Sequence, residues 1–148
     1  MGAKCEIAFS IVGMLVGISV FFCFGIVFSN WDCAAWGLVS GVLATITLYL
    51  HICFLQDRCK STATQLGGLM LTGCVFQLAG VCGFVAYLVL AISEHQGLVI
   101  RGRGFYLACV WCFMTWKWAF LQFYFARRYK RCFEKETGTS SDVPYVKI

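Results

Sequence analysis

The sequence predicts an all-α membrane protein, a four-transmembrane-helix bundle with both termini in the cytoplasm. Hydrophobic residues make up 60% of the 148 positions and charged residues only 13%, against about 25% charged residues in soluble domains. Four long, almost uncharged apolar runs account for the excess, and runs of about 18 or more such residues are typical of transmembrane helices. They are residues 7–29, 34–55, 66–92 and 104–125.

Continuous apolar runs favour helices, because the strands of a membrane barrel alternate apolar and polar residues and a helix pairs its own backbone polar groups in lipid. We expect residues 1–128 to form the bundle. Residues 129–148 are expected to form a cytoplasmic tail that is basic at first and then polar and disordered. The end of that tail, Tyr145–Ile148, is compatible with binding a sorting adaptor.

The first run, residues 7–29, is longer than the roughly 7–15-residue apolar core of a signal peptide, and no small-residue cleavage site follows it. We therefore expect it to remain in the protein as a signal anchor. Small residues at helical spacing predict close helix contacts, and exposed faces of this kind would also permit a homo-oligomer. They are Gly13 and Gly17, then Gly37 and Gly41, then Gly73, Gly80 and Gly83.

The second run, residues 34–55, contains His51 about one turn before its end. Helical steps back from His51 reach only small or weakly polar residues, so this face should point into the bundle rather than toward lipid. These residues are Thr47, Ala44, Ser40 and Gly37. Taken alone, His51 is as compatible with a hydrogen-bonded core histidine as with a ligand.

The third run, residues 66–92, leads into the motif SEHQG, which places His95 in an exoplasmic loop. Taken alone, His95 is equally compatible with an ordinary loop residue. The fourth run, residues 104–125, contains Lys117 about two and a half turns from its end. Snorkelling explains basic residues at the ends of spans, but an ionisable group this deep is costly and indicates a function.

Basic residues are distributed unevenly between the two sides of the predicted bundle. Nine of the 12 Lys and Arg residues fall on the side that holds both termini and the middle loop, and two fall on the other side. The positive-inside rule places the first side in the cytoplasm. The net charge of +5 therefore reflects topology, and no nucleic-acid partner is expected.

The cysteines do not suggest a disulfide framework, because only Cys33 of the 10 cysteines falls in an exoplasmic loop. The motif CVWC, with Cys109 and Cys112, lies inside the fourth run without a second pair. Packing is therefore favoured over redox or zinc chemistry for these two cysteines.

Two of the remaining features suit a flat, aromatic, iron-bearing anion. His51 and the segment FARRY, Phe125–Tyr129, should both lie near the cytoplasmic surface. Heme iron accepts histidine or tyrosine ligands, and Arg127 and Arg128 can bind heme carboxylates bidentately. His95 should lie roughly 30 Å away, across the membrane, so the two histidines would serve two positions on a path.

Four motifs, HICFLQD, LVLAISEHQ, VWCFMTWKWAFL and FARRY, carry a resemblance to a known family. The chain resembles the heme-responsive-gene family of small four-span heme transporters over nearly its whole length. The family's marks are a histidine (tyrosine in some members) in span two, a histidine in the second exoplasmic loop, and a Phe-Ala-Arg-Lys-Tyr motif. These marks fall on His51, His95 and Phe125–Tyr129, with Arg128 in place of the lysine.

The resemblance implies that the protein moves heme, as cargo, across the membrane toward the cytosol and is not an enzyme. It implies that both histidines are axial ligands of heme iron, with His95 capturing heme on the exoplasmic side and His51 binding it deeper in. Arg127 and Arg128 would hold the heme carboxylates at the exit, and Tyr129 would be an iron ligand or a ring contact. The membrane would be the plasma membrane, the endosome–lysosome membrane, or both.

Lys117 is not a mark of that family, and we include it among the heme-binding residues from its depth alone. Two alternatives stay open. A tetraspan scaffold or interaction protein would need larger exoplasmic loops with disulfides. A membrane glutathione-transferase-like enzyme would need an acid–base pair or a nucleophile–base dyad, and the sequence offers no obvious one.

Overall fold

The structure is a computed structural model that describes residues 2–56, 59–98 and 104–141. Helices make up almost all of the described chain, and no strand occurs within it, which confirms the all-α prediction. The helices are α1 (Ala3–Phe22), which continues as a π-helical turn η1 (Cys23–Val27), α2 (Trp31–Leu55), α3 (Cys59–Ser93) and α4 (Phe105–Ser141).

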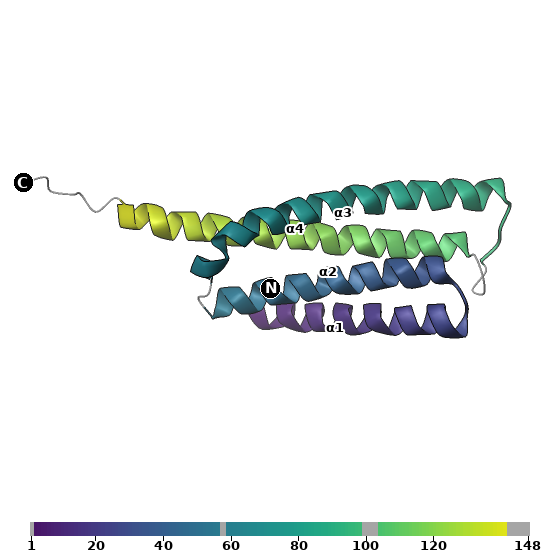
Figure 1. The fold of residues 1–148 in the computed structure, drawn as a ribbon, viewed down its shortest axis with the longest axis horizontal. Coiled ribbons are helices and arrows are strands. Elements are labelled where there is room, and N and C mark those ends of the chain that lie inside the picture. Colours follow the sequence, from purple (N-terminus) through teal and green to yellow (C-terminus); the bar gives the residue numbers. More distant parts are fainter. Residues whose placement is uncertain (1, 57–58, 99–103, 142–148) are drawn as a thin grey trace, which may run out of the picture.

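The four helices run side by side in the order α3, α4, α2, α1, so that α4 lies between α3 and α2 (Figure 1). At one end of the bundle α1 gives way to α2, and there α3 also ends and α4 begins; we call it the loop end. The opposite end contains the N-terminus and the last turn of α2, and α4 extends beyond it; we call it the terminal end.

Three segments of the described chain are long and apolar enough to cross a membrane: Lys4–Val27, Trp31–Leu55 and Gln65–Ser93. Helix α4 is not among them. Its apolar half contains Lys117 and Gln122 as well as several tryptophans and tyrosines, all of which lower the mean hydropathy. The predicted fourth span, residues 104–125, therefore stays a prediction.

Glycines mark the closest helix contacts, as the sequence predicts. A Cβ atom at Gly17 of α1 would lie 2.4 Å from the Cα of Gly41 of α2, and one at Gly80 of α3 would lie 3.0 Å from Trp116 of α4. Only a missing side chain allows backbones to approach this closely. Because neighbouring helices cover these glycines, they do not form the exposed faces that self-association would use.

Helix α4 extends about four turns beyond the predicted span, through the basic part of the predicted tail and into the polar part that we expected to be disordered. The structure continues the helix to Ser141. Arginine, lysine and glutamate are good helix formers, and Lys130 and Glu134 are spaced for a favourable pair one turn apart. The predicted sorting signal, Tyr145–Ile148, lies outside the described residues.

Candidate functional site

His51 lies in the last turns of α2 at the terminal end, and only 3% of it is exposed. The whole face that the sequence assigned to the interior is buried, which confirms that part of the prediction. Its other members are Gly37, Ser40, Ala44 and Thr47. One small residue per turn lets α1 and α4 approach α2 closely on either side, so His51 is enclosed by protein.

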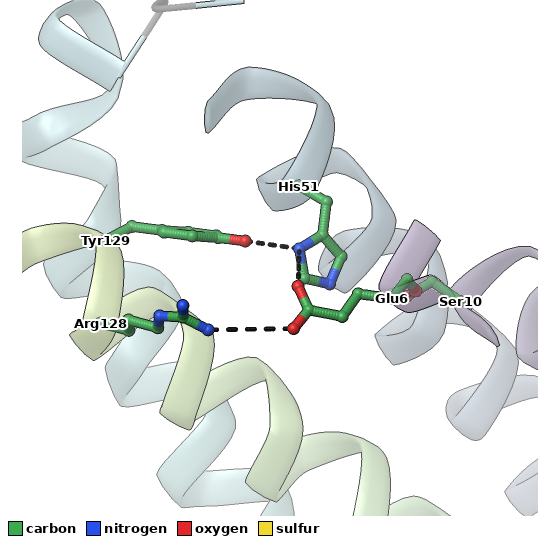
Figure 2. Close-up of polar contacts among 5 residues, drawn as sticks. All are labelled: Glu6, Ser10, His51, Arg128 and Tyr129. Atoms are coloured by element: carbon green, nitrogen blue, oxygen red, sulfur yellow. Dashed lines mark hydrogen bonds and ion pairs between the residues drawn. The ribbon is translucent and has the colours of Figure 1, made fainter. Parts of the chain in front are cut away.

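The FARRY segment of α4 meets His51 directly. The Nδ1 atom of His51 lies 2.5 Å from the Oη atom of Tyr129, at hydrogen-bond distance (Figure 2). The ring of Phe125 stands edge-on to the imidazole, with centroids 4.5 Å apart, and Phe54 of α2 stacks on Tyr129 at 4.2 Å. Phe125 and Tyr129 are four residues apart in a helix and therefore share one face.

A carboxylate from α1 completes this group of side chains. Oε2 of Glu6 lies 3.9 Å from Nδ1 of His51, and Oε1 lies 3.8 Å from a guanidinium nitrogen of Arg128. Glu6 is 15% exposed and Arg128 is 55% exposed. We call Glu6, His51, Arg128 and Tyr129 the terminal network; its members come from three different helices (Figure 2).

The second ring nitrogen of His51, Nε2, is buried and has no hydrogen-bond partner among the described residues. Buried polar atoms are usually paired, since leaving one unpaired costs about 1–3 kcal/mol. If Nδ1 carries the proton and donates it to Tyr129, Nε2 keeps a free lone pair. That is the form in which histidine binds a metal, with its other nitrogen held by a hydrogen bond.

Arg127 and Arg128 lie on the exposed side of α4, next to a groove of about 320 Å³. Side chains spaced three or four residues apart along α4 line it, namely Tyr124, Arg127, Arg128, Arg131, Cys132 and Lys135. Four basic residues make this groove suitable for carboxylates. Arg128 belongs both to this groove and to the terminal network, whereas Arg127 belongs to the groove alone.

Lys117 lies deeper along α4 and does not meet His51 in the described contacts. Its Nζ atom is 4.6 Å from the ring centroid of Phe9 and 5.9 Å from that of Trp118, a cation–π arrangement. It also lines a cavity of about 90 Å³ between α1, α2 and α4, together with Ser40 and Met114. Eleven helical residues separate Lys117 from Arg128, or about 16 Å.

His95 lies beyond the end of α3 at the loop end, exposed and with a φ of 49°. The polar contacts near it join helices rather than surround the imidazole. Tyr87 of α3 donates a hydrogen bond to Asp32 of α2 at 3.2 Å, and Gln96 accepts one from the backbone of Phe105 at 3.4 Å. The structure therefore separates the two predicted iron ligands by the length of the bundle.

Two further observations concern candidates from the sequence. Among the described residues, no three His, Cys, Asp or Glu side chains converge to hold a metal ion. In the CVWC motif, Cys109 donates to the carbonyl oxygen of Phe84 at 3.5 Å and Cys112 is fully buried, which agrees with a packing role.

Glu6 is the functional candidate that the sequence analysis missed. Its position just before the first apolar run describes it only as a carboxylate at the end of a span. Only the predicted topology could have indicated Glu6, because four spans would put the start of the first run on the same side of the membrane as His51. Local pattern alone does not bring α1, α2 and α4 together at one point.

Comparison with known proteins gives a consistent result. The family described as "Haem-transporter, endosomal/lysosomal, haem-responsive gene" matches residues 66–118, which include His95 and Lys117 but neither His51 nor the FARRY segment. No solved structure matches.

Three proteins of Caenorhabditis elegans are similar to most of the chain. "Heme transporter hrg-1" is 30% identical over 145 residues, covering 95% of this chain and 75% of that protein. "Heme transporter hrg-4" is 24% identical, covering 93% of this chain and 83% of that protein. "Heme transporter hrg-6" is 22% identical, covering 88% and 83%.

Proposed function

The chain belongs to the haem-responsive gene family of heme transporters, and on that premise we propose that it carries heme across a membrane toward the cytosol. Its named relatives are transporters rather than enzymes. The observation that supports the proposal most directly is that Nε2 of His51 is buried and has no hydrogen-bond partner among the described residues, while Phe125 and Tyr129 of the FARRY segment contact the same imidazole.

In the proposed arrangement the apolar half of α4, residues 104–125, is the fourth membrane span, and residues 1–128 form the bundle. The terminal end then faces the cytosol with both termini. The excess of basic residues on this side supports that orientation. The tail beyond the bundle, from residue 129, begins as the projecting part of α4.

At the terminal end, His51 would be an axial iron ligand through Nε2. Tyr129 would accept a hydrogen bond from the N–H group at Nδ1 and so hold the ring in the tautomer that can bind iron. Phe125 would form a wall against the porphyrin. Arg127 and Arg128 would bind the heme carboxylates, for which the basic groove on α4 gives room. The short distance between His51 and Tyr129 supports this division of roles.

His95 and Lys117 would act earlier on the same path. His95 is exposed at the opposite end of the bundle, where it can capture heme before entry. Lys117 would be a cationic position between the two ends, partly shielded by Phe9 and within reach of a passing carboxylate. The words "endosomal/lysosomal" in the family description favour an endosome–lysosome membrane, and the plasma membrane is the second expectation.

A heme titration of the purified full chain in detergent, followed by the Soret absorbance, tests the assignment. We expect saturable binding with a shifted band for the wild type. His51→Ala should lose the shift, whereas Arg127→Ala with Arg128→Ala should bind more weakly with the band unchanged.

Glu134→Gln is the matched control for a charge change on α4 and should behave as the wild type. A wild type with no saturable band would contradict heme binding. The tetraspan scaffold would then be the next hypothesis.

A further inference from the structure

Glu6 occupies a position that the proposed function does not explain. Its carboxylate lies between the guanidinium of Arg128, at 3.8 Å, and the imidazole of His51, at 3.9 Å (Figure 2). We propose that Glu6 is an internal substitute for a heme carboxylate, paired with Arg128 until a carboxylate of the cargo replaces it. This inference rests on the proposed function and adds a residue that selects cargo by its carboxylates.

The charges support an exchange of this kind. Glu6 is mostly enclosed, at 15% exposed, so its negative charge requires a compensating partner. Arg128 is 55% exposed and can turn outward toward the basic groove while keeping a carboxylate. Ion pairs with this degree of exposure are among the weakly stabilising ones. A second carboxylate can therefore replace Glu6 at little cost when the carboxylate of Glu6 moves into water, and heme supplies two.

The position of Glu6 in α1 makes its displacement easy. It lies in the first turn of a helix that begins at Ala3 and has no side-chain cap at Gly2. Uncapped helix ends fray readily. Within α1, backbone hydrogen bonds of the helix hold this turn in place. The hydroxyl group of Ser10 donates to the carbonyl oxygen of Glu6, at 2.9 Å, a contact that does not involve the carboxylate of Glu6.

Displacement of Glu6 would also expose the iron ligand. Within the described residues, α1 meets α4 through side chains rather than through close backbone packing. Phe9 against Trp118, with ring centroids 5.2 Å apart, is the contact next to Glu6 along this seam. Since Nε2 of His51 is buried, a flat ring reaches it only after a neighbouring group moves. Glu6, whose carboxylate lies 3.9 Å from the same imidazole in an uncapped first turn, is such a neighbour.

Titrations with three porphyrins distinguish competition between Glu6 and the heme carboxylates from a general effect of charge on porphyrin binding. Heme tests iron and carboxylates together, metal-free protoporphyrin tests the carboxylates alone, and protoporphyrin dimethyl ester has neither iron nor free carboxylates. Each is titrated into the purified full chain as wild type, Glu6→Gln and Glu134→Gln. Glu134 is an exposed carboxylate further along α4, so it reports the effect of net charge alone.

We expect Glu6→Gln to bind heme and metal-free protoporphyrin about two- to fivefold more tightly, because a weak competing ion pair is removed. Binding of the dimethyl ester should not change, and the Soret band of the heme complex should keep its position. Glu134→Gln should match the wild type. In the double variant Glu6→Gln with Arg128→Ala, the gain should disappear, because the competition acts through Arg128.

Weaker heme binding or a displaced Soret band in Glu6→Gln would overturn the proposal, because Glu6 would then support His51 rather than compete with cargo. An equal gain with the dimethyl ester would also overturn it. If the wild type binds heme with a shifted band and Glu6→Gln changes nothing, only the exchange fails. If the wild type shows no saturable Soret band, the proposed function fails before Glu6 is tested.

Discussion

The two ends of the bundle use histidine in opposite ways. At the terminal end, His51 is 3% exposed and has Tyr129 on one nitrogen, and its other nitrogen has no hydrogen-bond partner in the part of the chain that the structure describes. At the loop end, His95 is exposed and has a positive φ. The polar contacts at this end of the bundle connect neighbouring segments to one another. The same type of side chain is thus enclosed at one end and accessible at the other, which agrees with the proposed exit and capture roles.

The difference follows from the packing of the helices. Three helices place side chains at the terminal network, whereas at the loop end the polar side chains cap or link helices in pairs. Asn30 accepts from the backbone of Cys33 at 3.3 Å at the start of α2, and Tyr87 links α3 to Asp32 of α2. Position in the bundle, rather than residue type, therefore distinguishes His51, the candidate iron ligand at the exit, from His95, the candidate residue for heme capture.

The largest effect is expected when His51 and His95 are each substituted by alanine. The two variants are made separately and reconstituted into vesicles. His51→Ala removes the proposed iron ligand, and we expect its heme affinity to fall about a hundredfold or more, since even second-shell partners cost 10–100-fold. His95→Ala should reduce uptake at low heme concentration, and more heme should restore the rate. Uptake is measured with heme supplied on the side of the loop end. Equal losses of heme affinity in both variants would remove the distinction between the two ends.

A pair of hydroxyl deletions gives the next largest effect. Tyr129→Phe removes the hydroxyl group that contacts His51, and Tyr87→Phe removes the hydroxyl group that donates a hydrogen bond to Asp32. A net hydrogen bond contributes about 0.5–1.5 kcal/mol, so both variants should lose a comparable amount of thermal stability. Only Tyr129→Phe should weaken heme binding, by about three- to tenfold, and shift the Soret band. A change in the heme spectrum of Tyr87→Phe would show that the loop end also shapes the iron site.

The smallest effect is expected midway between the ends. Lys117→Met keeps the length of the side chain and its apolar stem but removes the cation over Phe9. A cation–π contact of this kind is worth about 0.5–1 kcal/mol, so thermal stability should change little. We expect the rate of heme transport to fall by about two- to threefold. An unchanged rate would assign Lys117 to packing alone.

Much of the fold is readable from the sequence, because it depends on composition and helical spacing. The four helices follow from four apolar runs, and the buried face of α2 follows from small residues that recur every turn up to His51. The use of Gly17 and Gly41 at a helix contact follows from small-residue spacing, although the spacing does not say which helices meet. These features are local, and each is encoded within about 25 neighbouring residues.

The candidate site is only partly readable, because its geometry is not local. His51 and Tyr129 are 78 residues apart in the chain, and no periodic pattern reports that their side chains meet. The order α3, α4, α2, α1 decides that Glu6 reaches the same point. The extension of α4 was missed for another reason, since a polar sequence rich in helix formers is compatible with both a coil and a projecting helix.

That extension has a mechanical consequence. Helix α4 has 37 residues, about 55 Å of helix, against roughly 30 Å of hydrocarbon. The end of α4 projects beyond the other helices (Figure 1), and with α4 as the proposed fourth span this end would form a stalk outside the hydrocarbon. In the proposed function, heme released beside Arg128 would therefore meet the basic side chains of Arg131 and Lys135 on the same helix, in addition to lipid headgroups. A soluble acceptor could bind this projecting helix from several directions. Transfer of the poorly soluble heme to the acceptor would then take place along the helix rather than through free solution.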